Sequence, residues 1–83
     1  MTFAELKKIC SPATLVSVST EFYDKEEKVY RHGMTIGYNV PIGDKRSFPD
    51  GAWFDNYKVI WIAVCESNLL MVVLLESEKK EIE

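Results

Sequence analysis

Aromatic side chains are concentrated in one short stretch of the sequence, residues 48–57, and basic residues flank it on both sides. Aromatic and basic side chains dominate the energetics of protein interfaces, and they also stack on the bases of single-stranded nucleic acid. The candidate partner-binding residues are Lys45, Arg46, Phe48, Asp50, Trp53, Phe54, Asp55 and Tyr57. The competing explanation is that at least two of the four aromatic side chains fill the core of a small domain.

The chain carries few groups that could perform catalysis or bind a metal. Its soft ligands and nucleophiles are His32, Cys10 and Cys65. No two of these have the spacing of a zinc motif, and the aspartates at positions 44, 50 and 55 lack the alternating pattern of a calcium loop. The sequence contains no glycine-rich phosphate loop and no nucleophile elbow. We therefore expect no enzymatic activity, no metal and no cofactor.

The charge balance weighs against nucleic acid as the partner. The chain has 10 basic and 13 acidic residues, for a net charge of −3. Residues 1–48 sum to +1 and residues 49–83 to −4, so neither half has the basic excess that neutralises a phosphate backbone. We therefore expect a protein partner. The alternatives are a small β-barrel that binds single-stranded nucleic acid through the same aromatics, and a structural self-assembling subunit.

A short helix over residues 2–10 is the first element that must position this stretch. Thr2 and Glu5 have the spacing of a capping box, and Pro12 ends the helix because it lacks an amide donor. The apolar positions at helical spacing are Phe3, Leu6, Ile9 and Cys10. A helix this short is marginal by itself, so we expect this apolar stripe to pack on a sheet.

Strand periodicity begins at residues 14–23, where apolar and polar side chains alternate. A polar turn separates this strand from residues 28–32, so the two are expected to form a hairpin. Gly33 then interrupts the pattern, and residues 34–40 alternate again, which predicts a bulge or corner at Gly33 followed by another strand. Residues 41–57 lose all periodicity and predict a loop that is long for a compact domain.

Residues 58–66 and 69–75 predict a second antiparallel hairpin. Ser67 and Asn68 separate them, and asparagine tolerates the positive φ of a tight turn. Both strands are apolar on both faces, as in strands that are buried on two sides. One short helix covers about one face. The other face needs a partly closed barrel, the aromatic loop or a second copy of the chain, so a homodimer is expected as readily as barrel closure.

The 83 residues, 47% of them hydrophobic, predict one globular domain over residues 1–75 and a charged tail over residues 76–83. The expected fold is α+β, with a short N-terminal helix packed on a four- to five-stranded antiparallel sheet or a partly closed small barrel. The N-terminus has acidic and basic residues where a secretory signal is apolar, and Glu66 interrupts the longest apolar stretch. We therefore expect no membrane association and a cytoplasmic location with reduced cysteines.

The function expected from these patterns is that of a small, non-enzymatic protein-interaction or adaptor module. It would bind its partner through the loop of residues 41–57, and the type is that of a bacterial or phage accessory protein. The identity of the partner is open.

Overall fold

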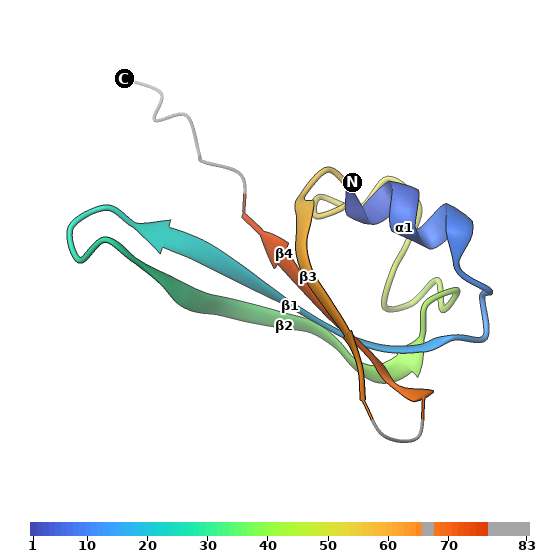
Figure 1. The fold of residues 1–83 in the computed structure, drawn as a ribbon. Coiled ribbons are helices and arrows are strands. Elements are labelled where there is room, and N and C mark those ends of the chain that lie inside the picture. The colour runs from blue at the N-terminus through green and yellow to red at the C-terminus, as the bar shows by residue number, and fades with distance from the viewer. Residues whose placement is uncertain (66–67, 77–83) are drawn as a thin grey trace.

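One short helix and four strands make up the part of the chain that the computed structural model describes, residues 1–65 and 68–76 (Figure 1). Their order is α1 (Phe3–Ile9), β1 (Leu15–Asp24), β2 (Val29–Pro41), β3 (Lys58–Val64) and β4 (Leu70–Leu75). The four strands form one sheet in the order β2-β1-β4-β3, so β2 and β3 are its edges. The expected α+β fold is therefore confirmed in its broad form.

The pairing within the sheet differs from the expected one. β1 pairs antiparallel with β2, and β3 pairs antiparallel with β4, as the two predicted hairpins require. The two hairpins meet through β1 and β4, however, and these strands run parallel. The sheet is thus mixed rather than antiparallel. Its two edges do not join within the described residues, so the partly closed barrel is not found.

Residues 34–40 continue β2 instead of forming a separate strand. The pairing of β1 with β2 shifts register three times, and one of these shifts spans the position of Gly33. β2 continues through this irregularity as a single strand. Two hydroxyl groups of β1 support these shifts. Ser17 Oγ accepts from the amide of Asn39 and Thr20 Oγ1 accepts from the amide of Met34, both at 3.0 Å. The ladder therefore continues, and the described sheet has no fifth strand.

The core lies on one face of the sheet, beneath α1 and the loop of residues 42–57, which Figure 1 shows together at one end of the molecule. Its buried members are Phe3, Leu6, Val16, Val18, Ile42, Phe48, Phe54, Val72 and Leu74. Phe3 of the helix contacts both loop phenylalanines, at 5.4 Å between ring centroids with Phe48 and 5.7 Å with Phe54. The sheet is thus one layer of the domain, and the helix and this loop together form the other.

The capping box predicted for α1 is present. The Glu5 amide donates to Thr2 Oγ1 at 3.3 Å and the Thr2 amide donates to Glu5 Oε1 at 2.8 Å. The hydrogen bond from the Thr2 amide holds the pKa of Glu5 below its ordinary value. The expected burial of Ile9 is wrong. Cys10, which the sequence placed on the same apolar stripe, does pack against the core. It lies nearly two turns from Phe3, whereas Ile9 points about a third of a turn away and is exposed.

The second hairpin forms as predicted, with Asn68 at a φ of +62°. Its expected burial on both faces is wrong for β3, which is an edge strand with most of its side chains exposed. Of the predicted tail, Glu76 belongs to the fold, since its amide donates to the Glu21 carbonyl at 2.8 Å. The remainder of that tail, residues 77–83, and the turn residues Glu66 and Ser67 lie outside the described residues.

Candidate functional site

The loop of residues 42–57 is fixed to the rest of the domain at both ends. At its start, the amides of Ile42 and Gly43 donate to carbonyls of the segment between α1 and β1, at 2.8 and 2.9 Å. At its end, the amides of Phe3 and Ala4 donate to the carbonyls of Tyr57 and Asp55, at 3.0 and 2.9 Å. The expected long loop is therefore joined by backbone hydrogen bonds both to the helix and to the segment that follows the helix.

A tight turn at residues 49–52 gives the middle of the loop its shape. The Ala52 amide donates to the Pro49 carbonyl at 3.3 Å, and Gly51 has a φ of +74°. A positive φ at the third residue is what a type II turn requires, and glycine adopts it without strain. The proline, aspartate and glycine that indicated a turn in the sequence thus form one.

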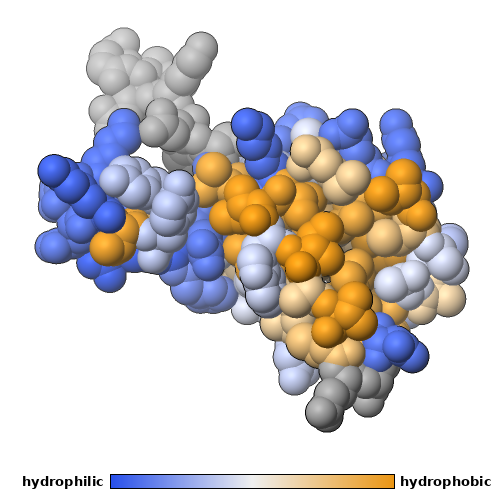
Figure 2. Space-filling model, in the orientation of Figure 1, coloured by the Kyte–Doolittle hydropathy of each residue, from blue (hydrophilic) through white to orange (hydrophobic). Residues whose placement is uncertain are grey.

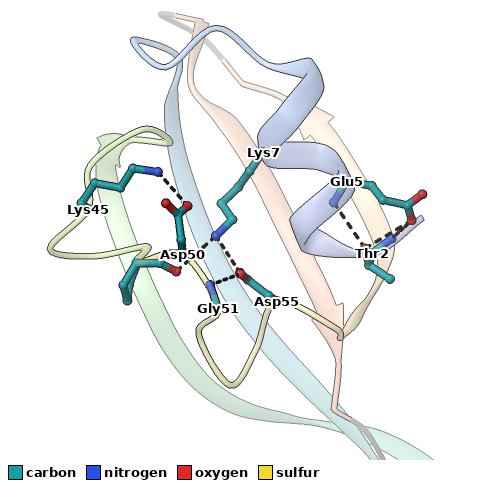
Figure 3. Close-up of polar contacts among 8 residues, drawn as sticks. Thr2, Glu5, Lys7, Lys45, Asp50, Gly51 and Asp55 are labelled. Atoms are coloured by element: carbon teal, nitrogen blue, oxygen red, sulfur yellow. Dashed lines mark hydrogen bonds and ion pairs between the residues drawn. The ribbon is translucent and has the colours of Figure 1, made fainter.

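An ion pair with little exposure joins this turn to the helix (Figure 3). Lys7 Nζ lies 2.7 Å from Asp55 Oδ1, and the two side chains are only 12% and 11% exposed. Lys7 Nζ also donates to the Pro49 carbonyl at 3.3 Å, and the Gly51 amide donates to Asp55 Oδ2 at 3.0 Å. Removing one member of such a pair leaves the other charge poorly compensated. The pair therefore fixes the turn against α1.

The sequence analysis assigned no role at the site to Lys7. Two signals in the sequence point to it. Lys7 lies four positions after Phe3 and so shares the face of the helix that is buried, and Asp55 lies within an aromatic stretch where a carboxylate needs a partner. The ammonium group also lies 5.5 Å from the centroid of the Phe3 ring, a cation–π distance.

Four of the predicted partner-binding residues do not lie on the open surface. Phe48 and Phe54 are core residues, Asp55 is buried in the ion pair, and Tyr57 is half-buried against the core. Their burial has a simple cause, because a small domain with one short helix needs the loop to cover its sheet. These four residues lie beneath the exposed part of the loop and help to hold it on the core.

The remaining four predicted residues are exposed, and we call them the loop surface: Lys45, Arg46, Asp50 and Trp53. Trp53 is 58% exposed, yet its ring makes edge contacts with Phe54 and Tyr57, at 5.1 and 5.7 Å between centroids. Lys45 Nζ donates to Asp50 Oδ1 at 2.8 Å. This hydrogen bond and the lysine charge hold the pKa of Asp50 below its ordinary value. The loop surface thus consists of one indole and three charged side chains.

A shallow hollow of about 410 Å³ separates the charged part of the loop surface from α1. Its lining residues are Ala4, Lys7, Lys8, Lys45, Asp50, Gly51 and Asp55. Figure 3 shows Lys45 and Lys7 with Asp50 between them. Ammonium and carboxylate groups that neutralise one another suit polar contacts with a partner.

Thr20 and Glu76 form a hydroxyl–carboxylate pair elsewhere in the sheet. Thr20 Oγ1 donates to Glu76 Oε2 at 2.6 Å, an arrangement that could activate a hydroxyl nucleophile. Thr20 is fully buried, however, so a substrate has no access to its hydroxyl group. Glu76 also affects Tyr57. The burial of the Tyr57 hydroxyl group and the negative charge of Glu76 both raise the pKa of Tyr57. This cluster serves the packing of β1, β2 and β4.

A second exposed surface lies on β3, which the sequence analysis expected to be covered. We call it the β3 edge: residues 60–64 of β3, with their exposed side chains and the backbone groups that point away from β4. Trp61 is 51% exposed, Ile60 and Ile62 are each 42% exposed, and Val64 is 71% exposed. In Figure 2, hydrophobic residues gather where Figure 1 draws β3, whereas the far end of the β1–β2 hairpin is mainly hydrophilic. Each of the two tryptophans thus lies on an exposed surface, Trp53 on the loop surface and Trp61 on the β3 edge.

The predicted soft ligands do not come together. Cys10 ends α1, Cys65 follows β3, and His32 is exposed on β2 opposite Glu21. Among the described residues, no three side chains of the metal-binding types form a group. The described helix is also too short to cross a membrane. Comparisons with family models, curated proteins and solved structures find no match to this chain.

Proposed function

We propose that this chain is a small, non-enzymatic protein-binding module that presents the loop surface to a partner protein. Trp53 is the apolar anchor in this proposal, and Lys45, Arg46 and Asp50 form the polar surround. The arrangement resembles the general anatomy of protein interfaces, in which a few aromatic and arginine side chains contribute most of the affinity and charged groups lie around them.

The observation that carries the proposal is an indole that is 58% exposed but held by the rings of Phe54 and Tyr57. Binding is weakened by the entropy lost when side chains and loops become ordered. Here the loop is already tied to α1 by backbone hydrogen bonds and by the Lys7–Asp55 pair, so little further ordering is needed. An exposed tryptophan on a fixed support is therefore well suited to act as an anchor.

Single-stranded nucleic acid is the less favoured partner. Binding of that kind combines several stacked aromatics with a basic groove. The loop surface offers one exposed indole, and Asp50 neutralises one of its two cations. Action in the cytoplasm, without catalysis, metal or cofactor, is part of the proposal.

The test compares three immobilised proteins: the wild type, Trp53→Ala and Tyr38→Ala. Tyr38 is the matched control, because it is an aromatic residue on β2 that is 75% exposed and outside the loop surface. Each is incubated with a lysate of the source organism, and the retained proteins are quantified. We expect one protein to be retained equally by the wild type and Tyr38→Ala, and about tenfold or more weakly by Trp53→Ala. Equal retention by all three would refute the role of Trp53.

A further inference from the structure

The β3 edge has backbone groups that the described part of the chain does not cover. On this side of β3, Lys58 makes an isolated bridge with Thr2, and the Val59 amide donates to the Met1 carbonyl at 2.8 Å. From residue 60 to residue 64, no described strand lies beside the edge. Exposed edges of this kind are templates for pairing with another strand.

The residues of the β3 edge lack most of the features that prevent such pairing. Natural edge strands carry charges, prolines or strong irregularities. Between Val59 and Cys65 the sequence has no charge, no proline and no glycine, and the one irregularity is a register shift at Ile60. The other edge, β2, is protected by three register shifts, by Asn39 at a φ of +54° and by the exposed Arg31 and His32. The two edges are therefore not equivalent.

We propose that the β3 edge pairs with the β3 edge of a second copy of this chain, antiparallel and about a two-fold axis at Ile62. The open segment extends from residue 60 to residue 64, and Ile62 is its centre. A two-fold pairing uses the same edge of both copies and closes, whereas pairing of β3 with β2 would continue without end. The product is one continuous eight-stranded sheet. This inference does not depend on the role of the loop surface.

The side chains of this register are self-complementary. Trp61 and Ala63 lie on the same face of the sheet, since they pair with Val73 and Met71 on β4. The two-fold axis places each Trp61 opposite the Ala63 of the other copy, so the small side chain leaves room for the indole. Ile62 lies opposite its own equivalent. No charged residue falls within the paired segment, so no like charges meet.

The apolar area of this surface is small for a specific interface. Half-exposed apolar side chains contribute on the order of 100 Å² each, so the four large ones give roughly 400 Å² per copy. An ordinary specific interface buries about 800 Å² per partner. Additional contact is available beside Trp61, where Glu21, Ile60 and Val73 complete a hollow of about 440 Å³. An interface of this size is at the small end of specific ones, so we expect a weak dimer that forms at micromolar or higher concentrations.

The first experiment measures molar mass by sedimentation equilibrium from about 1 µM to about 1 mM, the range that spans micromolar affinity. The wild type should rise from one chain mass of 9.6 kDa to twice that mass and stop there. Ile62→Lys places two ammonium groups at the axis and should remain at one chain mass. Tyr38→Lys, an equally drastic change on the exposed surface of β2, should behave as the wild type.

The second experiment remains decisive if Ile62→Lys does not fold. In a Cys65→Ser background, Ile62→Cys should form a disulfide-linked dimer on mild oxidation, because the two equivalent positions lie opposite each other. Val64→Cys should not, because its two copies would be about 13 Å apart along the strands and disulfides need Cα atoms within about 7 Å. A wild type that stays monomeric, masses that grow beyond two chains, or equal crosslinking of both cysteine variants would each overturn the proposal.

Discussion

The two tryptophans of this chain are almost equally exposed, but their surroundings differ. Trp53 lies on a loop whose underside is core: Phe54 is buried beneath it, and the Lys7–Asp55 pair fixes the adjacent turn. Trp61 lies on an edge strand that has β4 on one side and an uncovered edge on the other. Similar exposure therefore describes two kinds of surface. The first is supported by the core of its own domain, and the second is the edge of a sheet with no described strand beside it.

This difference predicts how each surface responds to substitution. Changes beneath the loop surface should lower the free energy of unfolding, because they remove buried contacts. Changes at the β3 edge should leave the monomer almost unaffected and act on association. Four measurements test this contrast.

The largest effect is expected for Phe48→Ala. Phe48 is fully buried and contacts the rings of Phe3 and Phe54, so its removal leaves a cavity under the loop. We expect the free energy of unfolding to fall by about 3–5 kcal/mol, a large part of the total for a domain of this size, as measured by urea denaturation. Phe22→Ala is the matched control, since Phe22 is partly exposed on β1. Similar losses for both variants would contradict the description of the loop as a core layer.

A smaller loss is expected for Lys7→Met, which retains the length of the side chain but removes its charge. The carboxylate of Asp55 is then left with little exposure and no cation beside it. We expect the free energy of unfolding to fall by about 2–3 kcal/mol in the same denaturation experiment. This is less than the cost of about 3–5 kcal/mol for breaking a fully buried pair, because both side chains retain some exposure. Lys8→Met, on the exposed face of α1, should change stability by less than about 0.5 kcal/mol. Equal values for the two lysine variants would argue against the role given to the ion pair.

The alanine variants of the two tryptophans should differ in their dependence on concentration. Trp53→Ala removes two edge-on ring contacts and should lower stability by about 1–2 kcal/mol at any protein concentration. Trp61→Ala should cost less than about 1 kcal/mol when the protein is dilute. If β3 pairs with a second copy, the deficit of Trp61→Ala grows with concentration, because the wild type gains stability by association. Thermal unfolding of the wild type and both variants at two protein concentrations measures the two deficits. If both deficits changed with concentration in the same way, the predicted difference between the two surfaces would be wrong.

The smallest effect is expected at the rim of the loop surface. The hydrogen bond and charge of Lys45 lower the pKa of Asp50 in the folded state. The ionised Asp50 carboxylate therefore stabilises the fold at any pH above its unfolded pKa of about 3.9. This stabilisation is lost as the pH falls through the lower pKa that Asp50 has in the folded state. Asp50→Asn should thus be slightly less stable than the wild type at pH 7 and equal to it at low pH. The deficit of Trp61→Ala should not change with pH, because it removes no ionisable contact.

Features that depend on neighbouring residues could be predicted from the sequence. The capping box of α1, the two hairpins and the positive φ of Asn68 all follow from side chains a few positions apart. The parallel pairing of β1 with β4 could not be predicted, because alternation within a strand does not indicate which strand lies beside it. The position of Ile9 was missed for a related reason, since an apolar stripe does not show where the sheet ends.

Half of the predicted site residues proved to be interior ones. Residue type indicated the aromatic stretch, but the same types fill cores and interfaces, so Phe48 and Trp53 could not be told apart in the sequence. The Lys7–Asp55 pair joins residues on α1 and on a distant loop, and only the fold brings them together. The β3 edge was missed because its apolar pattern is that of a central strand.

The parallel seam between β1 and β4 also has a consequence for how the chain folds. Each hairpin joins strands that are close in the sequence, whereas the seam brings together residues such as Thr20 and Glu76, 56 positions apart. Closing so long a segment of chain loses entropy before any contact compensates for it, and folds rich in such contacts reach the native state slowly. The meeting of two locally formed hairpins is therefore the step expected to set the rate of folding.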